Sequence, residues 1–210
     1  MTILQSFNLV VLISGHGSNL QAILDACASG EFAERARVAA VISNQAGAFG
    51  LERARYTDIP ALHQPKLPTQ TRQQYDSELA DLVASYQPDW VVLVGWMRIL
   101  TSAFLNRFPN RVINLHPALP GTFPGTHAIE RALEAYQRGE IQHTGVMVHL
   151  VPDEGVDSGP VLAQEVVPIH PNDTLESLTT RIHSVEHRLL IKTLRSLCQS
   201  PTRNVQFSNL

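Results

Sequence analysis

The sequence predicts an α/β protein with a doubly wound, mostly parallel sheet and helices on both faces. Short apolar runs rich in Val, Ile and Leu alternate with longer segments whose apolar residues recur at helical spacing. A continuous apolar run is typical of a strand buried on both faces, and its alternation with helices favours a parallel sheet. The composition, with 44% hydrophobic and 17% charged residues among 210, is that of a globular protein.

The first half of the chain contains three strand-like runs and three helical patterns. Strands are expected at 9–13, 38–43 and 90–95, and helices at 18–30, 49–57 and 69–86. Ser18 is the candidate cap of the first helix and Gly30 its end signal, while Pro88 stops the third helix.

The second half continues the alternation. Helices are expected at 102–108, at 127–138 and from Asp173 onward, strands at 111–115, 144–151 and 161–167, and a Pro- and Gly-rich loop at 117–125. Asp173, with Glu176 three positions later, fits a capping box for the last helix. The buried face of that helix is marked by Leu175, Leu178, Ile182, Val185 and Leu189. We expect a single domain over 1–200 and a polar tail over 201–210.

Charge and cysteine content narrow the class of partner. The formal net charge is -3, without the basic excess that a nucleic-acid binder usually carries.

The apolar start has no basic residue before it and predicts a first strand rather than a signal peptide, and no run is long enough to span a bilayer. Cys27 and Cys198 fit no metal or disulfide spacing and indicate free thiols in the cytoplasm. We expect small-molecule substrates, no nucleic acid or membrane partner, and a monomer or homodimer.

A glycine-rich segment, Gly15-His16-Gly17-Ser18-Asn19, follows the first strand. Open α/β sheets bind ligands at the carboxyl ends of their strands, and the exposed amides at a helix start favour an anion. A dinucleotide fingerprint would need a third glycine where this chain has Leu20, so NAD binding is disfavoured. The alternative is a tight strand–helix turn without a ligand.

Asn114 and His116 lie at the carboxyl end of the strand expected at 111–115, and strand alternation places them on one face. An amide and a protonated imidazole can both donate to a developing oxyanion, which suits acyl chemistry. The segment 153–159 offers Asp157 as an acid that holds the imidazole or takes a proton. The alternative is a histidine with a purely structural partner and an ordinary turn rich in Asp and Gly.

As a set, these motifs resemble the phosphoribosylglycinamide formyltransferases, a family with a Rossmann-like fold. Four segments carry the resemblance in the family's order, 12–21, 95–100, 114–117 and 149–160, within a match that extends from about residue 8 to about residue 190. The resemblance implies transfer of a formyl group from 10-formyltetrahydrofolate, a co-substrate, to the amine of glycinamide ribonucleotide in purine biosynthesis. It implies no metal and no covalent enzyme intermediate.

The resemblance also assigns roles to residues. Asn114, His116 and Asp157 would form the catalytic trio. The ribonucleotide would be held at its phosphate by Gly17, Ser18 and Asn19, and at its ribose by Glu186. The folate cleft would be lined by Met97, Arg98, Ile99 and Leu100, partly through backbone groups, with Arg72 near the tail carboxylates.

Three positions depart from the family pattern. The loop at 118–122 lacks the usual basic residue, Gly155 lengthens the loop before Asp157, and His183 replaces a basic residue three positions before Glu186. A phosphate contact from His183 would depend on pH. His183 and His187 also have a spacing that can bind metal, although an ordinary solvated helix face explains them equally.

Three alternative functions stay open at this point. A formyltetrahydrofolate deformylase shares the Asn-x-His and Asp pattern but carries an extra N-terminal domain, and a methionyl-tRNA formyltransferase carries an extra C-terminal one. A non-catalytic nucleotide-binding protein could also use this fold.

Overall fold

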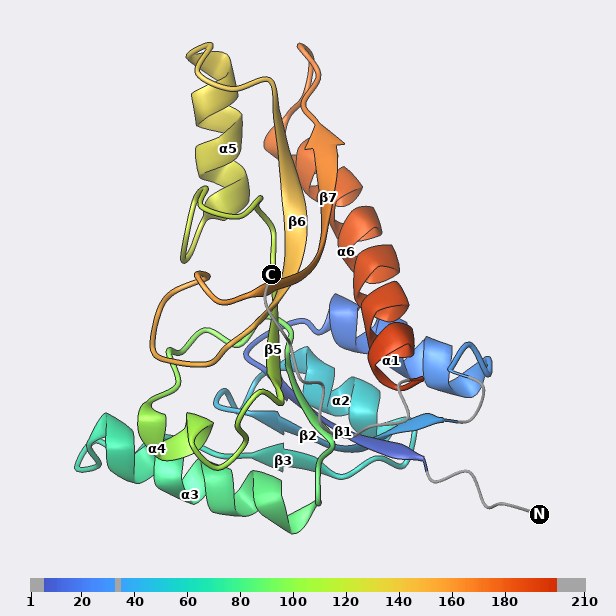
Figure 1. Ribbon diagram of the computed structural model, residues 1–210, viewed down its shortest axis with the longest axis vertical. Coiled ribbons are helices and arrows are strands. Elements are labelled where there is room, and N and C mark those ends of the chain that lie inside the picture. The colour runs from blue at the N-terminus through green and yellow to red at the C-terminus, as the bar shows by residue number, and fades with distance from the viewer. Residues whose placement is uncertain (1–5, 33–34, 200–210) are drawn as a thin grey trace.

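Seven strands form one sheet, in the order β3-β2-β1-β4-β5-β6-β7, within the computed structural model, which describes residues 6–32 and 35–199 (Figure 1). The strands are β1 (Phe7–Ile13), β2 (Ala36–Ser43), β3 (Ala61–His63), β4 (Trp90–Leu93), β5 (Val112–His116), β6 (His143–Leu150) and β7 (Val161–Pro168). The first five pair in parallel, whereas β6 is antiparallel to β5 and β7 to β6. The predicted mostly parallel α/β sheet is therefore confirmed, with an antiparallel edge. The predicted tail, 201–210, lies outside the described residues.

Helices cover both faces of this sheet. They are α1 (Ser18–Ala28), α2 (Phe49–Arg55), α3 (Arg72–Ser85), α4 (Ser102–Leu105), α5 (Ala128–Gln137) and α6 (Leu175–Leu197). Strand β1 separates two hydrophobic clusters, because Leu9, Val11 and Ile13 pack with α1 and α6, whereas Val10 and Leu12 pack with α3 and α4. This two-sided burial explains why β1 reads as an uninterrupted apolar run. Among the described residues, no helix has the length and apolar character needed to cross a membrane.

Two predicted helix caps are wrong. The N-cap of α1 is Gly17, in the left-handed region with φ 75°, and not Ser18. The capping box of α6 joins Thr174 and Ser177 rather than Asp173 and Glu176. Asp173 lies one position earlier and binds Arg181 instead, with two contacts of 2.7 Å.

Three other boundaries and surfaces differ from expectation. Helix α3 begins at Arg72 and not at 69. Its N-cap is Thr71, which forms a capping box with Gln74 in the first turn. Leu175 is 42% exposed in the first turn of α6, so it does not belong to that helix's buried face. Strand β3 was not expected, because its three residues are half-buried or exposed and form no apolar run.

The Asp173–Arg181 pair generates a stability prediction. The Arg181 guanidinium beside Asp173 holds the pKa of this buried carboxyl well below its ordinary value of 3.8. The resulting stabilisation is complete above the unfolded-state pKa and is lost as the pH falls through the folded-state pKa. We expect Asp173→Asn to lower the free energy of unfolding at pH 7 by about 1–3 kcal/mol, measured by urea denaturation.

The control for this prediction is Glu140→Gln, which breaks the exposed Arg138–Glu140 pair and should change stability little. Equal effects of the two substitutions would contradict a specific contribution from Asp173.

Candidate functional site

The structure brings Asn114, His116 and Asp157 together. Strand β5 ends with the first two on one face, and the loop between β6 and β7 carries Asp157 to them. Asn114 Nδ2 donates to Asp157 Oδ1 at 3.0 Å, and His116 Nδ1 lies 3.3 Å from Asp157 Oδ2. The backbone N–H of Gly125 donates to Asp157 Oδ2 at 2.8 Å. One carboxylate thus joins β5 to two loops.

His149 is a fourth member of this cluster, to which sequence reasoning gave no role. The β5–β6 register pairs Asn114 with His149, whose side chain is buried. His149 Nε2 lies 3.1 Å from Asn114 Nδ2 and 3.5 Å from Asp157 Oδ1, while Nδ1 lies 2.8 Å from Leu150 O. A carbonyl only accepts, so Nδ1 carries the hydrogen and Nε2 accepts from Asn114.

These contacts fix the orientation of the Asn114 amide. One amide hydrogen points to His149 Nε2 and the other to Asp157 Oδ1. The reversed amide would place its oxygen against a carboxylate, so the NH2 group must face Asp157. Asn114 therefore presents an oriented pair of donors at the end of β5.

His116 is held in its neutral form at neutral pH. Burial lowers the pKa of the ring below its ordinary value of 6.5, and the negative charge of Asp157 and the Phe123 carbonyl offset this only in part. Desolvation of the ring therefore acts against its protonated form more strongly than the charge of Asp157 favours it. Nε2 lies 3.1 Å from Phe123 O and Nδ1 lies 3.3 Å from Asp157 Oδ2, so the neutral ring can donate to one of these acceptors and the imidazolium to both.

Asp157 is ionised at neutral pH. Burial acts to raise the pKa of this carboxyl, but the hydrogen bond from Gly125 N–H and the neighbouring His116 ring outweigh burial and bring the pKa below its ordinary value of 3.8. Its backbone has φ 50°, a left-handed conformation that costs a non-glycine residue energy. The contacts that the carboxylate gains offset this cost.

At the end of β1, the glycine loop meets the middle of α6. Asn19 Nδ2 donates to Glu186 Oε2 at 3.1 Å, and His183 Nε2 lies 3.9 Å from the same oxygen. Glu186 is buried, and burial raises the pKa of its carboxyl to about 7 despite the hydrogen bond from Asn19. The predicted ribonucleotide residues Gly17, Ser18, Asn19 and Glu186 are thus brought to one place.

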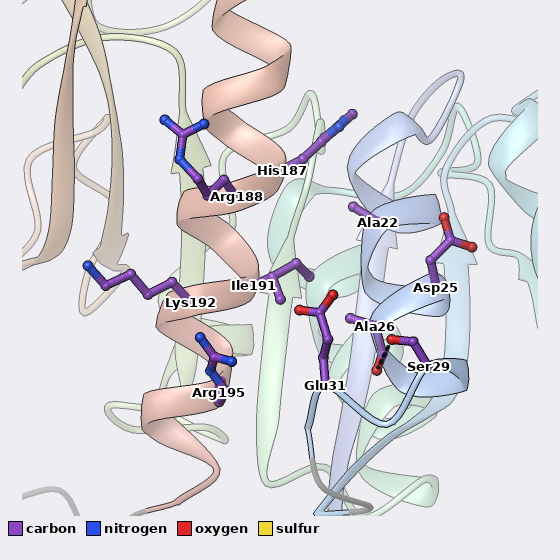
Figure 2. A pocket seen from close by; sticks show the side chains of 10 residues that line it. All are labelled: Ala22, Asp25, Ala26, Ser29, Glu31, His187, Arg188, Ile191, Lys192 and Arg195. Carbon is purple, nitrogen blue, oxygen red and sulfur yellow. Dashed lines mark hydrogen bonds between the residues drawn. The ribbon is translucent and has the colours of Figure 1, made fainter.

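A cavity of about 560 Å³ lies beyond this cluster, between α1 and α6 (Figure 2). Its lining includes His187, Lys192 and Arg195 from α6 and Asp25 and Glu31 from the α1 side. No residue of the catalytic trio lines this cavity, so it is separate from the cluster around Asp157.

The predicted folate segment lies after β4, beside the end of β1. Ser14 Oγ accepts from Met97 N at 2.9 Å, and the side chains of Met97 and Ile99 are 66% and 47% exposed. Arg98 stacks its guanidinium 4.8 Å from the centre of the Tyr75 ring. Leu100 is a core residue packed with the α3 cluster, so it can face a cleft only through its backbone.

Arg72, at the start of α3, contacts this segment. Its Nη2 donates to Ile99 O at 3.2 Å and lies 3.7 Å from Glu154 Oε2. The side chain is about half exposed, which leaves its charge accessible to an anionic group.

Comparisons with known proteins identify the family. The formyl transferase family model matches residues 7–194. The chain is 47% identical to the phosphoribosylglycinamide formyltransferase of Schizosaccharomyces pombe over 90% of this chain and 96% of that protein, and 44% identical to that of Escherichia coli K12 over 87% and 82%. The glycinamide ribonucleotide transformylase 1 structure from Symbiobacterium toebii matches with a TM-score of 0.86 and 42% identity, over 92% of this chain and 88% of that one.

The chain belongs to the phosphoribosylglycinamide formyltransferase family. It is therefore an enzyme of the transferase class, as the combination of motifs predicted.

Two departures from the family pattern leave the trio intact. The added Gly155 donates its N–H to Asp153 Oδ1 at 2.8 Å, and Glu154 Oε1 accepts from Ser102 N at 3.0 Å, so the longer loop is tied at both positions. The loop at 118–122 has no basic residue, but Arg131 of α5 donates to the Phe123 and Pro124 carbonyls at 2.8 and 2.6 Å. Arg131 thus supports the backbone that faces His116.

Histidine spacing alone does not assemble a metal site. Across 6–32 and 35–199, no group of three or more His, Cys, Asp or Glu residues is placed to hold a metal ion. His183 has Glu186 Oε2 3.9 Å from its Nε2, and burial lowers the pKa of both the His183 and the His187 ring.

The Glu186 carboxyl generates a prediction on pH and stability. Its folded-state pKa of about 7 exceeds the ordinary 4.5, so its contribution to stability is complete below the unfolded-state pKa and is lost as the pH rises through 7. The difference corresponds to on the order of 3 kcal/mol. We expect Glu186→Gln to flatten the fall in stability between pH 5 and 8, measured by urea denaturation at both pH values.

The control is Glu176→Gln, on the exposed first turn of the same helix, which should keep the wild-type pH dependence. A Glu186→Gln profile parallel to wild type would show that the buried carboxyl is ionised throughout.

Proposed function

We propose that the enzyme transfers the formyl group of 10-formyltetrahydrofolate to the amine of glycinamide ribonucleotide, in de novo purine biosynthesis. The observation that carries this proposal is the contact set of Asn114, His116 and Asp157 in a member of this family. The partners are small molecules, and the two free thiols, Cys27 and Cys198, suit the reducing cytoplasm.

The two substrates would meet at the carboxyl edge of the sheet. Gly17, Ser18 and Asn19 would hold the ribonucleotide phosphate, and Glu186 the ribose. The folate would lie along the segment of Met97, Arg98, Ile99 and Leu100, with its tail carboxylates near Arg72. The exposed apolar surface of Met97 and Ile99 suits an aromatic ring, and the backbone groups of this segment supply hydrogen bonds.

The reaction begins when the amine attacks the formyl carbon. A carbon–nitrogen bond forms and the formyl oxygen becomes an oxyanion. The Asn114 N–H that points to His149 Nε2 in the resting site then donates to this oxyanion instead. Neutral His116 takes the proton that the amine loses, and the imidazolium then stabilises the oxyanion. Asp157 balances the new charge and orients the ring. Collapse breaks the bond to the folate nitrogen, which receives the proton.

Absorbance of the folate over time tests this function directly. Purified protein is mixed with 10-formyltetrahydrofolate, with and without glycinamide ribonucleotide. Release of tetrahydrofolate that requires the ribonucleotide supports the transferase. Release without it indicates the deformylase alternative, and binding of both ligands without release indicates a non-catalytic protein.

We expect Asn114→Ala to lower kcat about a hundredfold or more, as loss of an oxyanion donor typically does. The control is Asn106→Ala, on the exposed end of α4, which should retain wild-type kcat. Asn106→Ala should melt as wild type does, and Asn114→Ala should fold but melt lower, because it removes one donor to the Asp157 carboxylate. Wild-type kcat in Asn114→Ala would remove Asn114 from the mechanism.

The protonation state of His116 in the free enzyme predicts the pH profile of kcat/KM for the folate. Because burial holds the pKa of this ring below 6.5 and the neutral ring accepts the proton, kcat/KM should rise with pH up to that pKa. A kcat/KM that falls between pH 5.5 and 7 would instead require imidazolium in the resting enzyme.

A further inference from the structure

Helix α2 packs backbone to backbone against the glycine loop. Gly50 N donates to Gly15 O at 3.2 Å. A Cβ atom on Gly17 would lie 2.8 Å from Gly50 Cα, and Gly17 has φ 75°, so both the approach and the conformation require glycine. The first turn of α2 therefore forms one wall of the loop that precedes α1.

Arg53, one turn further along α2, makes three contacts with this loop and with α1. Its Nε donates to His16 O at 2.9 Å, its Nη1 to Gln21 Oε1 at 2.9 Å, and its Nη2 lies 3.2 Å from His16 Nδ1. Guanidinium only donates, so His16 Nδ1 accepts and the ring hydrogen is on Nε2. One rigid side chain thus joins the loop to the first turn of α1.

Aromatic contacts support the same arrangement. The Arg53 guanidinium lies 4.9 Å from the centre of the Phe49 ring. Phe49 stacks on His16, with ring centres 5.3 Å apart and an angle of 26° between planes. The guanidinium is held by a planar surface as well as by hydrogen bonds, which an ammonium group cannot reproduce.

The charge of Arg53 is uncompensated within the described part of the chain. None of the ion pairs there includes Arg53, whereas Arg55, two residues on, pairs with Glu52. Three of the five N–H groups of Arg53 bind the loop and α1, and two have no such partner.

We propose that Arg53 is a positioning residue that holds the Gly15–Asn19 loop in the shape that receives the ribonucleotide phosphate. This inference rests on the proposed function, which places that phosphate at the loop. A loop that is ordered before binding loses less conformational entropy when the anion arrives, so its amides bind the anion more tightly. Arg53 acts on binding and has no contact with the trio around Asp157.

The first test separates KM from kcat in Arg53→Lys and Arg53→Gln. Both should raise the KM for the ribonucleotide about tenfold, because neither can make the three-point contact. The KM for the folate and kcat at saturation should stay within about twofold of wild type, since the trio is untouched. The controls, Arg55→Lys and Arg55→Gln on the exposed face of α2, should change none of these values.

A binding measurement makes the test independent of turnover. Ribose 5-phosphate is titrated into each protein by calorimetry, and its Kd should rise about tenfold in both Arg53 variants. Wild-type affinity in both would overturn the proposal, and full rescue by Arg53→Lys would show that charge alone matters, which also overturns it. If ribose 5-phosphate binding depends on Arg53 but no formyl transfer occurs, the proposed function fails and the positioning role stands.

Thermal unfolding of every variant shows whether that variant is still folded. Should Arg53→Gln fail to fold, Gln21→Met removes a single contact of the same arginine and leaves the charge in place. Its Kd for ribose 5-phosphate should rise about two- to threefold. An unchanged Kd in this variant would contradict the proposal that Arg53 positions the loop through its contact with α1.

Discussion

The largely buried carboxylate of Asp157 is the group on which the cluster of Asn114, His116 and His149 depends. Oδ1 contacts Asn114 and His149, while Oδ2 contacts His116 and the backbone N–H of Gly125. A buried charge is tolerated only when such partners surround it. These partners come from β5, β6 and the 117–125 loop, so satisfying one carboxylate also fixes the geometry of the segments around the reacting atoms.

Burial acts to raise the pKa of both Asp157 and Glu186, but their hydrogen-bond partners lead to opposite outcomes. Asp157 has donors on both oxygens, so its pKa falls, whereas Glu186 has one donor from Asn19 and its pKa rises to about 7. The cluster around Asp157 therefore holds a full negative charge next to a neutral His116. Such a pair is suited to accept a proton and then release it. A carboxyl that is partly protonated at neutral pH can both donate and accept hydrogen bonds.

The sequence predicts those features that follow from local pattern. The two-sided burial of β1 is visible in Leu9–Ile13, and the shared face of Asn114 and His116 follows from alternation along β5. The role of His149 does not follow, because it depends on an antiparallel partner strand whose register the sequence does not specify. The contacts of Arg53 could not be predicted for a similar reason, since its partners His16 and Gln21 lie more than thirty positions away in the sequence. The cap of α6 was misplaced because Asp173 has a better partner in Arg181.

Ser14 joins the ends of three parallel strands into one rigid edge. Its N–H donates to Gly95 O at 2.9 Å, and its hydroxyl donates to Asn44 Oδ1 at 2.6 Å while accepting from Met97 N at 2.9 Å. The glycine loop begins at the next residue, and the segment proposed to bind folate begins at Gly95. The distance between these two segments is therefore set by hydrogen bonds across β1, β2 and β4. Because β5 pairs directly with β4, Asn114 and His116 share this frame, so under the proposed function the amine and the formyl carbon would be brought together without rearrangement of the sheet.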